Sequence, residues 1–170
     1  MAFSGEIRVG ASAQVLGANM NVRVRGIHSQ NAEAESCRVG QRCALNLAGT
    51  GLNKDLIHRG DWIVTGALPP PSPKIDIRLR VLASENRALA HWTPVHVHIG
   101  AAESSGRVAV LGAAGISPGE SGLAQIVLDQ PLGAVYGDGL IIRDQSAKRT
   151  IGGGRVIDLY PPNRGRAKPE

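Results

Sequence analysis

The sequence predicts an all-β protein made of two small antiparallel β-barrels, and three observations carry this prediction. Glycine and proline are frequent, with 22 and 10 residues, which favours short strands joined by turns over long helices. Apolar residues alternate with polar ones over short segments, the period of a strand with one buried face. Aromatic residues make up only 3% of the chain, so the cores are expected to consist of aliphatic side chains.

A proline-rich run divides the chain into two parts. Residues 67–74 read ALPPPSPK, and proline both fixes φ and lacks the backbone donor that a sheet requires. We therefore expect a first barrel over 1–68, a linker over 69–74, a second barrel over 75–162 and a flexible tail over 163–170.

The first domain shows few strands. NVRVRGI alternates over residues 21–27, RCALNLAG over 42–49 reads as a more buried strand, and NKDLIHRGDWIV over 53–64 predicts a short helical turn capped by Asn53 and then a strand through Trp62. This gives about four strands before the linker, and a barrel of this type needs about six or more to close its edges. We therefore expect a partial barrel, truncated at its N-terminus.

The second domain alternates more clearly. In IDIRLRVL the side chains of Ile75, Ile77, Leu79 and Val81 share one face, and in PVHVHIG the two histidines lie opposite the aliphatic residues. SGRVAVL, GLAQIVL and GLIIRD follow, separated by turn residues. Several short strands at this spacing predict a closed barrel.

The charge balance indicates an acidic partner. The net charge is +5, and most of the basic residues are arginines, whose planar guanidinium matches phosphate oxygens and stacks on bases. Nucleic acid is the leading partner class for such a chain. The alternative is a basic surface that serves only solubility.

Other features argue against secretion and membrane insertion. Cys37 and Cys43 form neither a disulfide framework nor a zinc signature. No apolar run approaches the roughly 20 residues of a membrane span, and MAFSGEIRVG at the N-terminus lacks the regions of a signal peptide. We expect a cytoplasmic, reduced protein with no membrane partner.

The triple glycine at 152–154 does not predict a phosphate cradle. A P-loop requires Gly-Lys followed by Ser or Thr, which occurs nowhere in the chain. A dinucleotide site requires glycines between a strand and a helix, whereas RVIDLYPP after Gly154 reads as a strand stopped by proline. We expect the glycines to permit a bulge or a close approach of two backbones. No G-x-S-x-G elbow is present either, so no catalytic residue is predicted.

His96 and His98 lie on one face of one predicted strand, and this spacing can chelate a transition metal. A third ligand would have to come from His91, Glu103 or Asp76. Exposed histidines on an RNA-facing strand are the favoured interpretation, so no metal ligand is assigned and a metal-binding barrel is kept as an alternative function.

The basic residues of the second domain form the main candidate site. RDQSAKRT over 143–150 predicts a tight hairpin tip that presents Lys148 and Arg149. Such a surface can follow a phosphate backbone without reading bases. Arg143 and Arg155 belong to the same stretch, residues 141–157, and further basic side chains are expected on outward strand faces: Arg78, Arg80, His96, His98 and Arg107.

Two groups of motifs carry a resemblance to a known family. VRVRGIHSQN, GQRCALNLAG and HRGDWIV look like barrel two of the selenocysteine-specific elongation factors. HWTPVHVHIGAAESSGRVAVL and IIRDQSAKRTIGGGRVI look like barrel three, and the last stretch also parallels the closing hairpin of elongation factor Tu. The likeness covers about residues 4–162.

The resemblance implies a role in binding selenocysteinyl-tRNA during UGA decoding on the ribosome. It implies that Arg42, in the GQR motif, contacts the aminoacyl end, since a guanidinium suits an ionised selenolate and not a neutral serine hydroxyl. Barrel three would contact the acceptor and T stems. Our expected contacts there are Arg143, Lys148 and Arg149, followed by His96, His98 and Arg107.

The resemblance also implies that the parent factor binds GTP and Mg²⁺ through a GTPase domain that this sequence does not include. We therefore expect the chain to have no cofactor and no enzymatic activity of its own. A third alternative is a strand-pairing interaction module, in which open edges of the first barrel join two copies into a homodimer.

Overall fold

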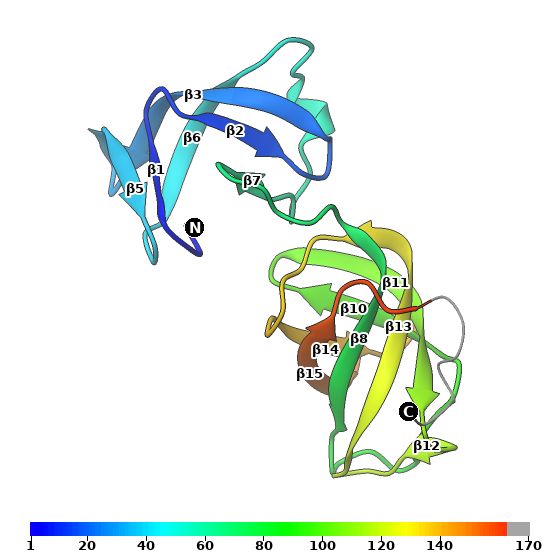
Figure 1. The fold of residues 1–170 in the computed structure, drawn as a ribbon. Helices are drawn as coiled ribbons and strands as arrows, with labels where there is room; N and C mark the ends of the chain where they lie inside the picture. Colours follow the sequence, from blue (N-terminus) through cyan, green and yellow to red (C-terminus); the bar gives the residue numbers. More distant parts are fainter. Residues whose placement is uncertain (163–170) are drawn as a thin grey trace. The chain divides into compact units, whose positions relative to one another are not determined.

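The computed structural model describes residues 1–162, and these form an all-β fold, as predicted (Figure 1). The chain divides into two compact units, Met1–Leu68 and a second unit that begins at Pro69. The helical element among these residues is one 3₁₀ turn, η1, over Lys54–Leu56, and no helix within 1–162 is long and apolar enough to cross a bilayer. The tail predicted over 163–170 lies outside the described residues.

The first unit is built around one long strand, β3. This strand pairs with β2, β4 and β6, while β7 pairs with β2, and β1 and β5 form a separate two-stranded sheet. The strands are β1 Glu6–Arg8, β2 Ser12–Val15, β3 Met20–Ser29, β4 Ala32–Ala34, β5 Ser36–Arg38, β6 Cys43–Ala48 and β7 Ile63–Val64.

These seven strands exceed the four or so that the sequence indicates. The strands β1, β4 and β5 contain three residues each, too few for a period of two to be recognised. The prediction of about four strands before residue 69 is therefore wrong. Within the residues described, the sheets of the first unit do not close into one barrel.

The packing of the first unit follows the alternation of β3. Val22 and Val24 are buried and Arg23 and Arg25 are exposed. β6 is a half-buried strand that alternates, and not the more buried strand expected. The predicted cap is confirmed, because the side chain of Asn53 accepts a hydrogen bond from the backbone N–H of Asp55 at the start of η1.

The second unit contains a closed barrel of six strands. Around the barrel the order is β10-β11-β13-β8-β15-β14, and pairing of β14 with β10 completes the circle. The strands are β8 Ser72–Val81, β10 Thr93–Ile99, β11 Ala102–Leu111, β13 Ser121–Leu132, β14 Gly139–Arg143 and β15 Thr150–Asp158, with β9 Leu89–Ala90 and β12 Gly115–Ile116 forming a small separate ribbon. β8 starts three residues before the second barrel was expected to begin.

The core of the barrel is aliphatic. Its buried cluster consists of Ile, Leu, Val and Ala side chains, as the low aromatic content implied. On β8 the predicted inward residues Ile75, Ile77, Leu79 and Val81 are all fully buried.

The triple glycine lies where β15 pairs with β8. Gly152 and Gly154 lie opposite Val81 and Leu79 on β8, and a Cβ at either position would overlap a backbone carbonyl oxygen of β8, that of Arg80 or of Arg78. Glycine therefore permits the two backbones to approach each other closely, which was one of the two structural interpretations of this motif.

We predict that Gly154→Ala destabilises the second unit by about 1–3 kcal/mol, because the added methyl group must push β15 away from β8. Gly139→Ala is the matched control, since a Cβ there meets no atom within 4 Å. Urea unfolding followed by the fluorescence of Trp92, in a Trp62→Phe background, measures the second unit. Equal stability of the two alanine variants would contradict this account of the glycines.

Glu6 is the electrostatic centre of the β1–β5 sheet. Its carboxylate accepts hydrogen bonds from the Arg8 guanidinium at 2.7 Å and from Nε of Arg38 at 3.2 Å. A hydrogen bond with the Ser36 side chain, followed by those with Arg38 and Arg8, lowers the pKa of Glu6 from 4.5 to about 2.

We predict that this carboxylate makes the first unit sensitive to acid. Because its folded-state pKa is lowered, its stabilisation is complete above about pH 4.5 and disappears as the pH falls towards 2. The stability difference between the wild type and Glu6→Gln should therefore shrink across this interval. Urea unfolding followed by Trp62 fluorescence, in a Trp92→Phe background, measures it. Glu35→Gln, which removes an exposed carboxylate, should show no such trend.

Candidate nucleic-acid interface

The tip of the β14–β15 hairpin is organised by one carboxylate. Oδ1 of Asp144 accepts hydrogen bonds from the backbone N–H groups of Lys148 at 2.9 Å and Arg149 at 3.2 Å, and from the Ser146 hydroxyl at 3.1 Å. These bonds, that of Arg149 first, lower the pKa of Asp144. The predicted hairpin is confirmed, and its tip has a defined shape at neutral pH because Asp144 is ionised.

Lys148 and Arg149 differ in their surroundings, although both are exposed. The ammonium of Lys148 has no partner within residues 1–162. The guanidinium of Arg149 donates to the carboxylate of Glu85, and this contact raises the pKa of Arg149. The side chain of Glu85 is only 10% exposed, so Glu85 provides a fixed counter-charge. Lys148 is therefore the free cation of the pair.

Arg143 and His96 support the tip. The Arg143 guanidinium donates to the backbone carbonyl of Lys148 at 3.3 Å, and its Nε is buried without a partner in the described structure. Nε2 of His96 lies 3.1 Å from the carbonyl oxygen of Gln145, and His96 is directly opposite Arg143 in the β10–β14 ladder. Both residues hold the loop from the adjacent strands, a role that the sequence pattern did not suggest.

Arg107 and His98 lie on the same outer surface on either side of His96. Arg107 is opposite Pro94 on β10, towards the hairpin tip, and its guanidinium reaches the carbonyl of Trp92 at 3.5 Å. His98 is opposite Ile141, further from the tip. Nδ1 of His98 lies 3.5 Å from the Glu103 carboxylate. The structure thus gathers Arg107, His96, Arg143, Lys148 and Arg149 at one end of the barrel.

The metal-binding alternative finds no support in this arrangement. Residues 1–162 contain no group of three His, Cys, Asp or Glu side chains that could hold an ion. Nε2 of His96 already faces a backbone carbonyl, so the two histidines of the HxH motif have different environments.

Arg42 belongs to the first unit, where it directly precedes β6. Its backbone carbonyl accepts from the Ser29 hydroxyl at 3.4 Å, while its exposed guanidinium has no partner within residues 1–162. The loop that carries it lies between two free thiols, and the buried Cys37 contacts the carbonyl of Gln41 at 3.8 Å. Burial, followed by the proximity of Cys37, raises the pKa of Cys43 to about 11, so this thiol stays protonated.

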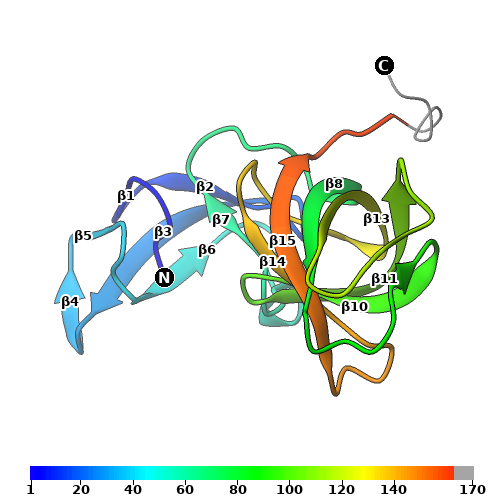
Figure 2. The same ribbon diagram turned by 90° about the horizontal axis from the view of Figure 1, so that it is seen from below.

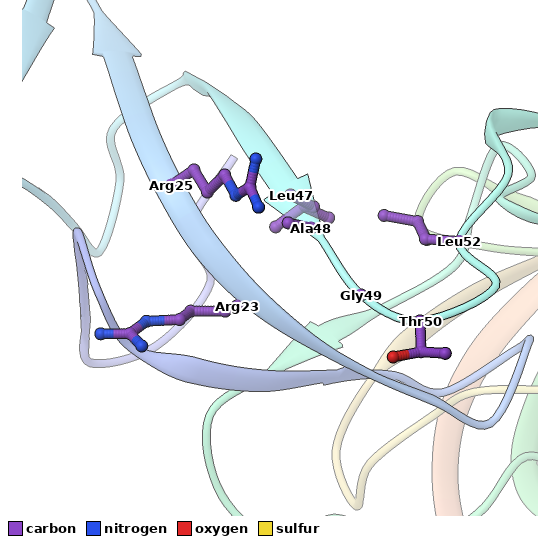
Figure 3. Close-up of a pocket in the computed structure, with 7 residues that line it drawn as sticks. All are labelled: Arg23, Arg25, Leu47, Ala48, Gly49, Thr50 and Leu52. Carbon is purple, nitrogen blue, oxygen red and sulfur yellow. The ribbon is translucent and has the colours of Figure 1, made fainter.

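A shallow pocket of about 480 Å³ on the first unit contains a second pair of cations (Figure 3). Its lining residues are Arg23, Arg25, Leu47, Ala48, Gly49, Thr50 and Leu52. In Figure 3 the guanidinium groups of Arg23 and Arg25 point in opposite directions across the width of β3, so they do not converge on one point. Arg42 does not line this pocket.

Sequence reasoning missed two residues that contact the basic side chains or backbone of the candidate interface, Asp144 and Glu85. Asp144 had a usable signal, because an aspartate at the start of a turn commonly bonds backbone N–H groups ahead of it. Glu85 had none, because it lies 64 residues from Arg149 and no local pattern connects the two.

Comparison with known proteins assigns the second unit and the chain as a whole. A profile described as "Selenocysteine-specific elongation factor, beta-barrel domain" matches residues 76–163. The selenocysteine-specific elongation factor of Escherichia coli K12 is 40% identical over 99% of the chain, and that of Haemophilus influenzae is 33% identical over 96%. The chain covers 25% of each of these two proteins.

Two further comparisons extend the likeness. Elongation factor Tu 2 of Streptomyces avermitilis is 29% identical over 91% of the chain, which covers 40% of that protein. The structure of apo translation elongation factor SelB from Methanococcus maripaludis matches 93% of the chain with a TM-score of 0.78 and 19% identity, and the chain covers 38% of it. At this identity the structural match supports the fold, and the profile and the first two relatives carry the assignment. The chain belongs to the β-barrel domain family of selenocysteine-specific elongation factors.

Proposed function

We propose that this chain is the aminoacyl-tRNA-binding portion of a selenocysteine-specific elongation factor, acting with selenocysteinyl-tRNA during UGA decoding. Membership of the family of selenocysteine-specific elongation factors supports a role in translation. The observation that carries the proposal is the hairpin tip of the closed barrel, where Lys148 projects from a loop held in shape by Asp144.

The proposed contact is with phosphate oxygens and not with bases. Lys148 supplies a free charge, and the surrounding basic groups of Arg107 and Arg143 raise the local positive potential. The backbone of the tip is fixed in advance by three side chains that bond to it: Asp144, Arg143 and His96. Little conformational entropy is then lost on binding, which favours recognition of the shape of an RNA stem.

Arg42 is proposed to contact the aminoacyl end. Its unpaired guanidinium offers donors that an ionised selenolate accepts and a neutral serine hydroxyl matches less well. The neighbouring thiol of Cys43 is protonated, so it adds no negative charge that would oppose a selenolate.

The role proposed for this chain is binding and not catalysis. In the whole factor we assign GTP and Mg²⁺ to the GTPase domain, and contact with the ribosome and a cytoplasmic location to the complete protein. Association of two chains through open edges of the first unit stays a prediction, as does the tRNA contact of His98.

We predict that Lys148→Glu weakens binding of selenocysteinyl-tRNA and lowers the slope of log K against log salt concentration by about 1, the value for one lost phosphate contact. Fluorescence anisotropy between 50 and 200 mM KCl measures both quantities. Lys54→Glu, at an exposed lysine of η1, is the charge-matched control and should have little effect. Equal behaviour of the two variants would remove the hairpin tip from the interface.

We predict the opposite effect for Glu85→Gln. Removing this carboxylate releases the guanidinium of Arg149 from its ion pair, so RNA affinity should rise and the salt dependence should become steeper. In an Arg149→Gln background the Glu85→Gln change should have no effect, which isolates the coupling between the two residues. A loss of affinity on Glu85→Gln alone would show that the ion pair shapes the binding surface and does not restrain it.

A further inference from the structure

The outer face of the β8–β15 ladder holds three arginines on two adjacent strands. Arg78 and Arg155 are directly opposite each other, and Arg80 is opposite Gly153. All three arginines are exposed. The two strands lie side by side in the barrel (Figure 2). Like charges directly opposite in a ladder are destabilising, so this arrangement has an electrostatic cost for the fold.

Within residues 1–162 none of these three arginines forms an ion pair with a carboxylate. Arg155 donates to the carbonyl of Gly137 at 2.9 Å, which orients its guanidinium without cancelling the charge. Arg78 and Arg80 have no hydrogen-bond or ion-pair partner within residues 1–162. The next pair along this face is acidic, Asp76 opposite Asp158, and it marks where the basic surface ends.

The flanks of the three arginines are apolar and low. Leu123 on β13 is opposite Arg78 and is 42% exposed, and Ile141 on β14 is opposite Gly153 and is 50% exposed. Gly153 has no side chain, so the surface between Arg80 and Ile141 stays shallow. A flat basic surface with apolar edges can contact both the phosphates and the sugars of a nucleic acid.

This surface continues from the hairpin tip. Thr150 follows Arg149 directly and begins β15, and Arg155 lies five residues further along the same strand, a distance of about 17 Å at the usual rise. The cations of the tip and those of the ladder therefore follow one another along the outer surface of the barrel, from Lys148 to Arg155.

We propose that Arg78, Arg80 and Arg155, the arginine ladder, form a second site for the phosphodiester backbone of RNA and extend the footprint of the hairpin tip along β8 and β15. The inference rests on the proposed function, since it assumes that the tip contacts RNA. Arginine suits this ligand because its donor fork matches two phosphate oxygens.

The test uses the full chain and a labelled RNA hairpin with the length of a tRNA acceptor–T-stem helix. Anisotropy between 50 and 200 mM KCl gives the affinity and salt slope of four proteins: the wild type, the double variant Arg78→Gln/Arg80→Gln, Arg155→Gln and Lys148→Glu. Arg87→Gln, at an exposed arginine between β8 and β9, is the matched control. A labelled poly-glutamate peptide tests binding of an acidic protein segment.

The proposal predicts that the salt slope falls by about 2 in the double variant and by about 1 in Arg155→Gln, with thermal unfolding temperatures equal to or above that of the wild type because repulsion is relieved. RNA binding by the double variant that equals that of Arg87→Gln would overturn it, as would loss of poly-glutamate binding with RNA binding intact. If Lys148→Glu alone weakens binding, only the arginine ladder is refuted. If the wild-type chain binds no RNA at 50 mM KCl, the proposed function fails as well.

Discussion

The contact between β15 and β8 is one of the strand pairings that close the barrel, and at this contact two backbones come closer than a side chain at Gly152 or Gly154 would permit. Gly152 and Gly154 permit this close approach. Arg155 on the outer face of β15, and Lys148 and Arg149 just before its first residue, carry charges of the proposed RNA-binding surface. The same short segment therefore seals an aliphatic core on its inner side and carries basic groups on its outer side. The strand β15 therefore contributes both to the fold and to the proposed function.

The second constraint is the ionised carboxylate of Asp144. Since it accepts hydrogen bonds from two backbone N–H groups and a hydroxyl, this carboxylate links both sides of the hairpin tip through polar bonds. The side chains that the tip presents are free to interact with a ligand, except where another residue already binds them. Charge at this end of the barrel is thus set by pairs of residues and not by the number of basic side chains.

Much of the fold could be predicted from the sequence because period-two alternation shows which side of a strand is buried. Ile75, Ile77 and the histidines of β10 lie where that pattern puts them. The three-residue strands of the first unit could not be recognised, since their pairing comes from distant partners. The hairpin itself could be predicted from local residues, but the hydrogen bonds of its side chains could not. Glu85 pairs with Arg149 from 64 positions away, and Arg143 donates to a backbone carbonyl in the loop that follows it.

The ion pair between Arg149 and Glu85 has a consequence for timing in the proposed role. A phosphate that approaches Arg149 has to displace an internal carboxylate that is itself largely shielded from water, and the same carboxylate recaptures the guanidinium when the phosphate moves away. Such an internal competitor shortens the lifetime of the complex, because each momentary opening is filled from within the protein. In the proposed role the bound RNA must also be released, so fast dissociation matters as much as high affinity.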